Sequence, residues 1–299
     1  MFTYAPTEPV PTEHEDADAL VVWGNTRKQL SDSAARLHNL RWVAALSAGV
    51  DVIEAAGFAP EVVITNGSGL HDGPVAEHTL MLSLAAARRF DLAYGAQLEG
   101  RWAKELCWAQ PVGVQRDGST FPGLGTLADA RITIWGFGSI AASLAPLYRA
   151  LGGHVTGIAN SSGERHGFPV VSGAEILEVL AETDLLVNIL PSLPSTEKII
   201  STSVFETLPN HAWLVNVGRG ATVDEDALDQ ALRSGQIGGA ALDVFAREPL
   251  PTESPLWTAP NVLITPHAAG GRPVGASEFV AKNVQRFLAG EPLINTIER

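Results

Sequence analysis

The sequence Ile-Thr-Ile-Trp-Gly-Phe-Gly-Ser-Ile-Ala occupies residues 132–141, and it decides the expected fold. A short apolar strand runs directly into Gly136-x-Gly138-x-x-Ala141, and apolar residues at helical spacing then predict a helix that ends near Leu151. Gly136 permits a tight turn, Gly138 has no side chain to keep a pyrophosphate away from the backbone, and the small Ala141 lets helix and strand pack closely. Because a helix N-terminus also attracts phosphate, the stretch predicts a dinucleotide-binding strand–turn–helix.

Strands alternate with helices beyond this turn, which favours parallel pairing. The pattern predicts six strands in a doubly wound, Rossmann-type sheet, within a dinucleotide-binding domain of residues 81–271. The expected strands are Ile132–Trp135, His154–Ile158, Leu185–Leu190, Trp213–Val217, Ala240–Val244 and Val262–Thr265. The expected helices between them are Ser139–Leu151, Ala174–Ala181, Ser203–Leu208 and Asp224–Ser234.

A smaller α/β domain of three or four strands is expected before the dinucleotide-binding domain. A helix over Val75–Arg89 is apolar on nearly every face, which is typical of a buried helix and marks the boundary. The final helix, about Val274–Leu288, is expected to pack back on the first domain. We therefore expect a flavodoxin-like substrate domain of residues 1–80 and 272–299. Its predicted elements are strands Ala19–Trp23, Trp42–Leu46 and Val62–Thr65 and a helix from Ser31 to Leu40.

The composition excludes several classes of function. The chain has 299 residues, of which 45% are hydrophobic, enough for one large or two ordinary globular domains. The net charge of −13 argues against nucleic-acid binding, which requires a basic face. The longest apolar stretch, Leu80–Ala87, is too short to span a membrane, and Cys107, the only cysteine, has no partner for a disulfide within the chain. We expect a cytoplasmic protein with no membrane segment and no metal site.

Three polar residues follow successive strands of the predicted sheet: Arg219, Glu248 and His267. Ligands of such sheets bind beyond the carboxyl ends of the strands, so these side chains are expected to meet there. Each of them alone has a structural explanation, as a surface arginine, a loop carboxylate or a structural histidine. Their occurrence at matching strand ends favours a shared chemical role.

This combination of side chains suits redox chemistry at a carbinol or carbonyl carbon. Hydride transfer to a ketone builds negative charge on its oxygen, which a protonated His267 can neutralise by donating a proton. A carboxylate beside the imidazole favours the charged form of the ring, and an arginine binds a substrate carboxylate through two hydrogen bonds. The predicted substrate is therefore a small 2-oxo or 2-hydroxy acid, and the predicted cofactor is a nicotinamide dinucleotide.

The chain resembles the D-isomer-specific 2-hydroxyacid dehydrogenases, a family that includes phosphoglycerate dehydrogenase and glyoxylate/hydroxypyruvate reductases. The resemblance extends from about residue 20 to 295 and rests on a series of motifs in family order. They are Ser47-Ala48-Gly49-Val50-Asp51, Val75-Ala76-Glu77-His78-Thr79, Gly136-Phe137-Gly138-Ser139-Ile140-Ala141, Asn216-Val217-Gly218-Arg219-Gly220, Ala241-Leu242-Asp243-Val244-Phe245 with Glu248-Pro249-Leu250, and Pro266-His267-x-Ala269-Gly270. It implies an NAD(P)-dependent oxidoreductase that acts on a D-2-hydroxy acid or a 2-oxo acid.

The resemblance also implies roles for individual residues and a homodimer. The implied catalytic residues are Arg219, Glu248 and His267. The backbone N–H groups of Ala48 and Gly49 are expected to share the substrate carboxylate with the arginine, and Asp243 is expected to hold the nicotinamide carboxamide. Further cofactor contacts are expected from Thr79, Gly136, Gly138, Ser139, Ile140, Leu190 and Val217.

The sequence departs from the NAD-binding pattern after the second strand of the nucleotide domain. An aspartate that binds the ribose is expected about 20 residues after the glycines, but Ala159 stands there, followed by Asn160-Ser161-Ser162-Gly163-Glu164-Arg165. An acidic side chain would repel a 2′-phosphate, whereas small polar residues and an arginine accommodate one. We expect NADPH to be used at least as well as NADH, with Asn160, Ser161, Ser162 or Arg165 at the 2′-phosphate. The alternative is that Arg165 is a solvated loop charge.

A binding function on the same fold is the alternative to an enzyme. A dinucleotide-sensing, corepressor-like protein would bind the same cofactor, and the complete triad does not exclude it, because corepressors of the family can keep these residues. Oxidation of a reduced nicotinamide in the presence of a 2-oxo acid discriminates the two.

Overall fold

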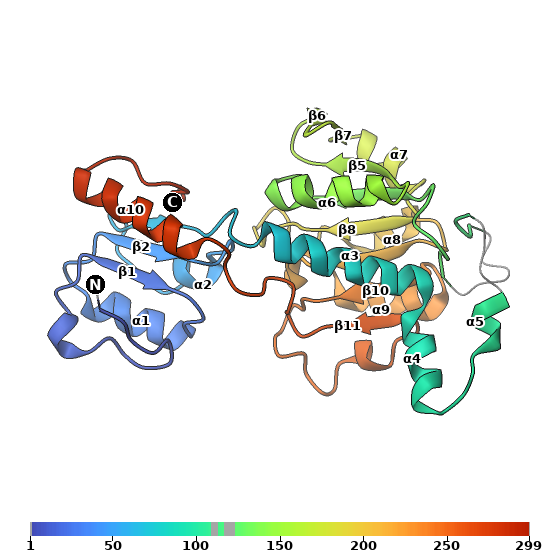
Figure 1. Ribbon diagram of the computed structural model, residues 1–299, viewed down its shortest axis with the longest axis horizontal. Helices are drawn as coiled ribbons and strands as arrows, with labels where there is room; N and C mark the ends of the chain where they lie inside the picture. Colours follow the sequence, from blue (N-terminus) through green and yellow to red (C-terminus); the bar gives the residue numbers. More distant parts are fainter. Residues whose placement is uncertain (1, 109–112, 117–122, 299) are drawn as a thin grey trace. The chain divides into compact units, whose positions relative to one another are not determined.

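A computed structural model describes residues 2–108, 113–116 and 123–298 of the chain (Figure 1). The contacts divide the chain into two compact units. One comprises residues 1–72 and 271–299, and the other comprises residues 73–270. The first boundary therefore falls eight residues before the expected one at 80/81, at the start of a long helix instead of within it.

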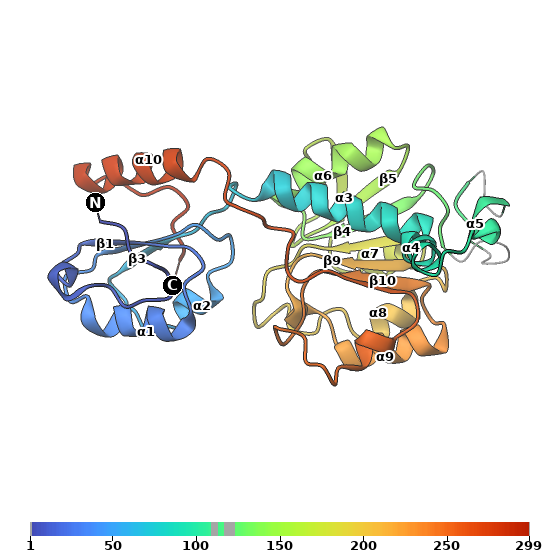
Figure 2. The same cartoon turned by 60° about the horizontal axis from the view of Figure 1, so that its bottom comes forward.

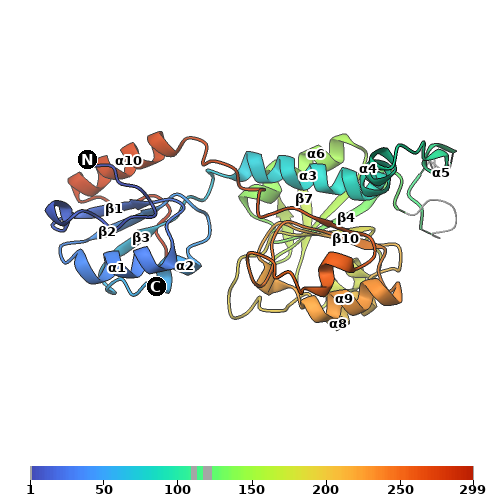
Figure 3. The same ribbon diagram turned by 90° about the horizontal axis from the view of Figure 1, so that it is seen from below.

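The smaller unit is a parallel three-stranded sheet, in the order β1-β2-β3, with helices on both faces. Helices α1 and α2 cover one face and α10 covers the other (Figures 2 and 3). Trp42, fully buried in β2, contacts Phe287 of α10 in a tilted arrangement with ring centroids 5.5 Å apart, and it donates a hydrogen bond to Thr65. The elements are η1 Thr12–His14, β1 Ala19–Val22, α1 Arg27–Arg36, β2 Trp42–Ala45, α2 Asp51–Glu54, β3 Val63–Thr65 and α10 Ala276–Ala289.

The start of the first helix was predicted five residues too late. It begins after Thr26, whose hydroxyl accepts the Gln29 N–H and caps the helix, not after Ser31. It ends at Arg36 instead of continuing to Leu40. Threonine and serine are both good N-caps, so the sequence offered two starts, and the observed helix includes the buried Leu30.

The larger unit is built on an eight-stranded sheet in the order β11-β10-β9-β8-β4-β5-β7-β6. Strand β6 is antiparallel to β7, and the other pairs between these strands are parallel. The strands are β4 Arg131–Trp135, β5 His154–Ile158, β6 Gly163–Arg165, β7 Phe168–Val171, β8 Leu185–Asn188, β9 Trp213–Asn216, β10 Gly239–Leu242 and β11 Val262–Ile264.

Helices cover both faces of this sheet, as a doubly wound fold requires. Helices α3 and α6 lie on one face, and α8 and α9 lie on the other (Figures 2 and 3). Buried Leu82 and Tyr148 pack against the first face, and buried Phe205 and Leu228 pack against the second. The remaining bounds are α3 Asp72–Arg88, α4 Phe90–Leu98, α5 Lys104–Trp108, α6 Ser139–Ala150, α7 Glu175–Leu180, α8 Thr202–Thr207, η2 Gly220–Thr222, α9 Glu225–Ser234 and η3 Pro255–Thr258.

The prediction of six strands in this sheet was wrong, because β6 and β7 were not recognised. The segment Gly163–Arg165 is polar, and Phe168–Val171 contains Pro169, so neither has the apolar continuity of a central strand. Both lie at the edge of the sheet, where exposed and proline-containing strands are tolerated. The expected connection of residues 100–128 lies partly outside the described residues, and its described part contains α5.

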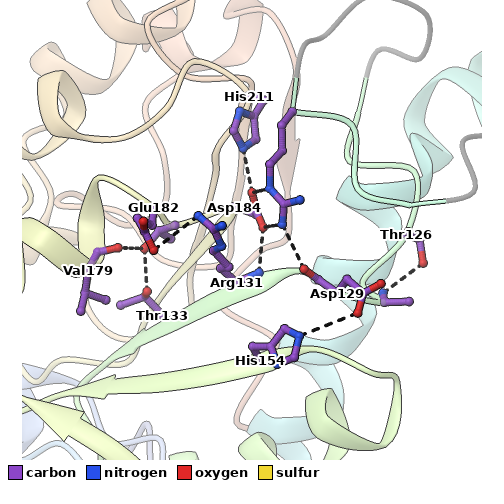
Figure 4. Close-up of polar contacts among 12 residues, drawn as sticks. Thr126, Asp129, Arg131, Thr133, His154, Val179, Glu182, Asp184 and His211 are labelled. Atoms are coloured by element: carbon purple, nitrogen blue, oxygen red, sulfur yellow. Dashed lines mark hydrogen bonds and ion pairs between the residues drawn. The ribbon is translucent and has the colours of Figure 1, made fainter.

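A cluster of charged and polar side chains around the buried Asp184 links the amino-terminal ends of three neighbouring strands, β4, β8 and β9 (Figure 4). Asp184, with no exposed surface, precedes β8 and accepts hydrogen bonds from the Arg131 N–H at 2.7 Å and from His211 Nε2 at 2.8 Å. The guanidinium of Arg116 donates to both of its carboxylate oxygens, at 3.0 and 2.8 Å. Burial alone would raise the pKa of Asp184, but the hydrogen bonds from His211, Arg116 and the Arg131 N–H lower it.

In the part of the chain that the structure describes, no helix combines the length and the apolar character needed to cross a membrane.

Candidate active site

The three predicted catalytic residues follow β9, β10 and β11, which are neighbours in the sheet. Arg219 lies just after β9, Glu248 lies in the loop after β10, and His267 lies just after β11. The strands are parallel, so these loops emerge at the same edge, where ligands of such sheets bind.

His267 and Glu248 form a hydrogen-bonded pair. The Nδ1 atom of the imidazole lies 2.6 Å from Glu248 Oε2, and the other carboxylate oxygen accepts the Phe245 N–H at 3.0 Å. The side chains are 48% and 35% exposed, so solvent or a ligand reaches both. Because one ring nitrogen is engaged by the carboxylate, Nε2 is left as the atom for proton exchange with a ligand.

The hydrogen-bonded pair favours the charged form of the imidazole. The hydrogen bond to Glu248 raises the pKa of His267 above its ordinary value, against the opposing effects of burial and of the Arg219 charge. Burial would raise the pKa of Glu248, but the hydrogen bonds from His267 and the Phe245 N–H, together with the charges of His267 and Arg219, lower it. Both shifts act in the same direction, so the pair stabilises an imidazolium beside a carboxylate.

Close approach of two backbones brings Arg219 toward this pair. A Cβ at Gly220 would overlap the backbone of Phe245, so only glycine lets the loop after β9 lie against the loop after β10. The carbonyl of Arg219 accepts the Thr222 hydroxyl at 2.6 Å, and its guanidinium donates to the Gly218 carbonyl at 2.8 Å. These contacts place a fixed positive charge near the imidazole and the carboxylate.

The glycine turn has the geometry that a dinucleotide requires. Gly136 has a φ of +100°, and a Cβ there would lie 3.0 Å from the Ile189 carbonyl, so a side chain would be strained and crowded. Gly138 is exposed, with no atom within 4 Å of where its Cβ would lie, and it immediately precedes α6. Phosphate can therefore approach the backbone at the start of this helix. The residues present fit a dinucleotide.

The other predicted cofactor contacts lie around the same sheet edge. Ser139 is exposed and Ile140 is half-buried at the start of α6. Leu190 follows β8, and Val217, which is buried, follows β9. Thr79 is fully buried in α3, where its hydroxyl donates to the Val75 carbonyl at 2.6 Å. Its contact with the cofactor stays a prediction.

The segment after β5 presents a small polar cluster. Ala159 follows the strand, and Asn160 and Ser161 after it are exposed. The Arg165 guanidinium donates to the Ser161 hydroxyl at 2.8 Å and to its carbonyl at 3.3 Å, which holds the arginine beside the serine. Ser162 is instead engaged with Glu175 at 2.7 Å. The cluster offers hydroxyl and guanidinium donors at the position where NAD-binding proteins carry an aspartate.

Ala48 and Gly49 belong to the smaller unit, in the loop after β2. The Ala48 carbonyl accepts from the Asn66 side chain at 3.0 Å, and the Gly49 carbonyl accepts from the Ser47 hydroxyl at 2.8 Å. Both hydrogen bonds use the carbonyl oxygens of Ala48 and Gly49, and both come from side chains of the smaller unit, which holds the loop in place. The role of their N–H groups toward a substrate stays a prediction.

Two residues that support this edge were missed by sequence reasoning. Glu225, the first residue of α9, accepts the Ala246 N–H at 2.7 Å and so fastens the loop that carries Glu248. Burial raises the pKa of Glu225. Thr265 donates to the Asp243 carboxylate at 2.5 Å. No local pattern indicates either contact, because each depends on how two distant loops meet. Among the described residues, no group of three or more side chains suits a metal ion.

The fold and the residues at this edge define a nicotinamide-dependent oxidoreductase. Residues 80–269 match the family described as "D-isomer specific 2-hydroxyacid dehydrogenase, NAD binding domain". A glyoxylate/hydroxypyruvate reductase A from Escherichia fergusonii is 33% identical over 96% of this chain and 88% of its own length. The chain therefore belongs to the D-isomer specific 2-hydroxyacid dehydrogenase family, and it is an NAD(P)-dependent enzyme acting on 2-hydroxy or 2-oxo acids.

Solved structures of the family agree with this assignment. A D-isomer specific 2-hydroxyacid dehydrogenase from Xanthobacter autotrophicus Py2, in complex with NADPH and MES, has a TM-score of 0.79 and 33% identity, covering 95% of this chain and 84% of that one. An NADPH-dependent glyoxylate/hydroxypyruvate reductase from Sinorhizobium meliloti, in complex with NADP and sulfate, has a TM-score of 0.78 and 29% identity, covering 96% and 88%. These matches favour an enzyme over a corepressor-like binding protein.

Proposed function

We propose that this chain reduces a small 2-oxo acid, of the glyoxylate or hydroxypyruvate type, to the D-2-hydroxy acid with NADPH. The observation that carries the proposal is the His267–Glu248 pair at 2.6 Å, beside Arg219 and on the sheet edge that also bears the glycine turn. An imidazolium, a carboxylate and a guanidinium are the groups that reduction of a carboxylated ketone requires. The named activities of the reductases that resemble this chain support the substrate class.

Each residue has a defined task in this proposal. The nicotinamide, when bound, supplies the hydride. His267 donates a proton from Nε2 to the substrate oxygen. Before this transfer, Glu248 favours the charged form of the imidazole and holds the ring in the orientation that points Nε2 at the substrate. Arg219 binds the substrate carboxylate, which the N–H groups of Ala48 and Gly49 share. The family resemblance assigns Asp243 to the nicotinamide carboxamide. Its side chain is fully buried and both carboxylate oxygens already accept hydrogen bonds, so this contact stays a prediction.

Replacing Glu248 with glutamine is expected to move the pH profile. The hydrogen bond from Glu248 raises the pKa of His267, so its loss lowers that pKa and reduction declines from a lower pH upward. Loss of a hydrogen bond to a charged group should also reduce kcat/KM at neutral pH by roughly 10- to 100-fold. The measurement is kcat/KM for 2-oxo acid reduction from pH 5 to 9, with the exposed Glu253→Gln as the matched control. An unmoved profile contradicts the assigned pairing.

We propose that the 2′-phosphate of NADPH contacts Arg165, Ser161 and Asn160. The arginine and the serine hydroxyl already lie together at 2.8 Å, and Ala159 leaves the place of the ribose-binding aspartate without charge. Charge-assisted hydrogen bonds to phosphate are stronger than neutral ones, so this cluster favours the phosphorylated cofactor. The NADPH and NADP bound to relatives support the same preference.

The wild-type protein is expected to reduce glyoxylate or hydroxypyruvate faster with NADPH than with NADH. Arg165→Ala should raise KM for NADPH by roughly tenfold, through loss of a charged hydrogen bond, and leave KM for NADH unchanged. The absorbance of the reduced nicotinamide measures the rates with NADPH and NADH and the two KM values, across a panel of 2-oxo acids. The exposed Arg27→Ala serves as the control. A tenfold larger kcat/KM with NADH would reject the NADPH preference, and no turnover with any 2-oxo acid would favour the dinucleotide-sensing alternative.

A homodimer and a cytoplasmic location stay predictions for this chain. The homodimer is supported by large apolar side chains exposed on α3, on α4 and in the segment after α4. These side chains are Met81, Leu84, Phe90, Leu98 and Trp102.

A further inference from the structure

The turn that carries His267 is built around the Asp243 side chain. This carboxylate is fully buried. Its Oδ1 accepts the Thr265 hydroxyl at 2.5 Å and the Ala268 N–H at 2.8 Å, and its Oδ2 accepts the Ala269 N–H at 2.9 Å. The Asp243 carbonyl also accepts the His267 N–H at 2.8 Å. These four hydrogen bonds join the turn to Asp243, the residue that directly follows β10.

The backbone of His267 needs this support. Its φ is +51°, in the left-handed region that residues with a side chain rarely adopt. Such a conformation persists only where the surrounding structure holds it. Weakening the bonds to Asp243 would therefore allow the backbone to relax and would move the imidazole away from Glu248.

His78 of α3 contacts this arrangement from a distant part of the sequence. Its Nε2 lies 3.0 Å from Thr265 Oγ1 and 3.2 Å from Asp243 Oδ1, and its side chain is only 16% exposed. The hydrogen-bond directions follow from the chemistry of the acceptor. The Thr265 hydroxyl donates its one proton to Asp243 Oδ1, because a carboxylate oxygen accepts. The hydroxyl oxygen can then only accept from His78, whose Nε2 must carry a proton.

We propose that His78 is a positioning residue for the proposed proton donor. Its Nε2–H completes the hydrogen bonding of Thr265 and Asp243, which in turn fix the turn that presents His267. The family resemblance includes the segment Val75–Thr79 but assigns a role only to Thr79, so this assignment is separate from it. The expected effect of His78 on turnover rests on the proposed function. The expected effect of His78 on the conformation of the turn does not.

The test compares substitutions that keep or remove the donor. His78→Gln offers an amide N–H at a similar reach, whereas His78→Leu keeps much of the volume and has no donor. His78→Leu is expected to lower kcat by about tenfold, the effect of one lost hydrogen bond, with KM for the 2-oxo acid changed less than about twofold, because Arg219 binds the substrate carboxylate in the proposed function. His78→Gln should restore kcat to within about threefold of the wild type. The exposed His154→Leu, on β5, is the control.

A second readout needs neither substrate nor cofactor. Amide hydrogen exchange of a peptide covering residues 265–270 should be about tenfold faster in His78→Leu and unchanged in His78→Gln, because the turn opens more often when its support is lost. If His78→Leu does not fold, His78→Asn replaces it, since asparagine has the donor but not the reach. Faster exchange in a protein that reduces no 2-oxo acid would reject the proposed function and leave the positioning role standing. Wild-type exchange and wild-type kcat in a folded His78→Leu or His78→Asn would overturn the positioning role.

Discussion

Replacing His267 with alanine is expected to lower kcat for 2-oxo acid reduction by about 10²–10⁴, the usual contribution of a positioned general acid. The imidazole is held 2.6 Å from Glu248, and this hydrogen bond raises the pKa of His267, so the wild type keeps a donatable proton to higher pH than a free imidazole does. Alanine removes the donor, and water must then protonate the substrate oxygen. Steady-state kinetics of nicotinamide oxidation measures the loss.

Binding measurements separate this loss from a general defect. The dissociation constant for NADPH should stay within about threefold of the wild-type value, because the glycine turn lies after β4, away from β11. The exposed His38→Ala should match the wild type in both assays. A kcat near the wild-type value in the His267 variant would remove this residue from the mechanism.

Replacing Arg219 with alanine is expected to lower kcat/KM by about 10²–10³, with most of the change in KM for the 2-oxo acid. The guanidinium follows β9, and its backbone is fastened by the Thr222 hydroxyl at 2.6 Å. Loss of one partner of a charged, desolvated pair leaves the substrate carboxylate without its counter-ion, which accounts for an effect of this size. Initial rates across a wide range of 2-oxo acid concentration give both parameters.

The identity of the cation distinguishes a specific contact from a general charge effect. Arg219→Lys should recover only part of the activity, because an ammonium group is a point charge and does not bind a carboxylate through two parallel hydrogen bonds. The exposed Arg27→Ala should have no effect. If Arg219→Ala lowered kcat without changing KM, the arginine would not be the ligand of the substrate carboxylate.

The sequence predicted the centre of the larger unit well because local signals are strong there. The apolar run before Gly136 forms β4, and α6 follows as Ser139–Ala150. The polar residues after β9, β10 and β11 could also be placed, because the parallel alternation of strands fixes where each strand ends.

The parts that were not predicted depend on tertiary contacts. The β6–β7 pair forms because its backbone finds partners at the edge of the sheet, although its residues do not have a strand pattern. The contact of His78 with Thr265 and the support of the Ala246 N–H by Glu225 join segments far apart in the chain. Such contacts follow from the packing of helices on the sheet, which periodicity and motif spacing do not encode.

The buried Asp184 has a consequence for how this scaffold can diversify. It ties Arg131, Arg116 and His211 together at the end of the sheet opposite the loops that carry the proposed chemistry (Figure 4). Strand order and register are thus secured independently of those loops, and loops tolerate changes in length and sequence better than the elements that they connect. Grafting loops from a relative with a different acid preference therefore leaves the anchoring end intact, which makes this chain a suitable host for redesigned specificity.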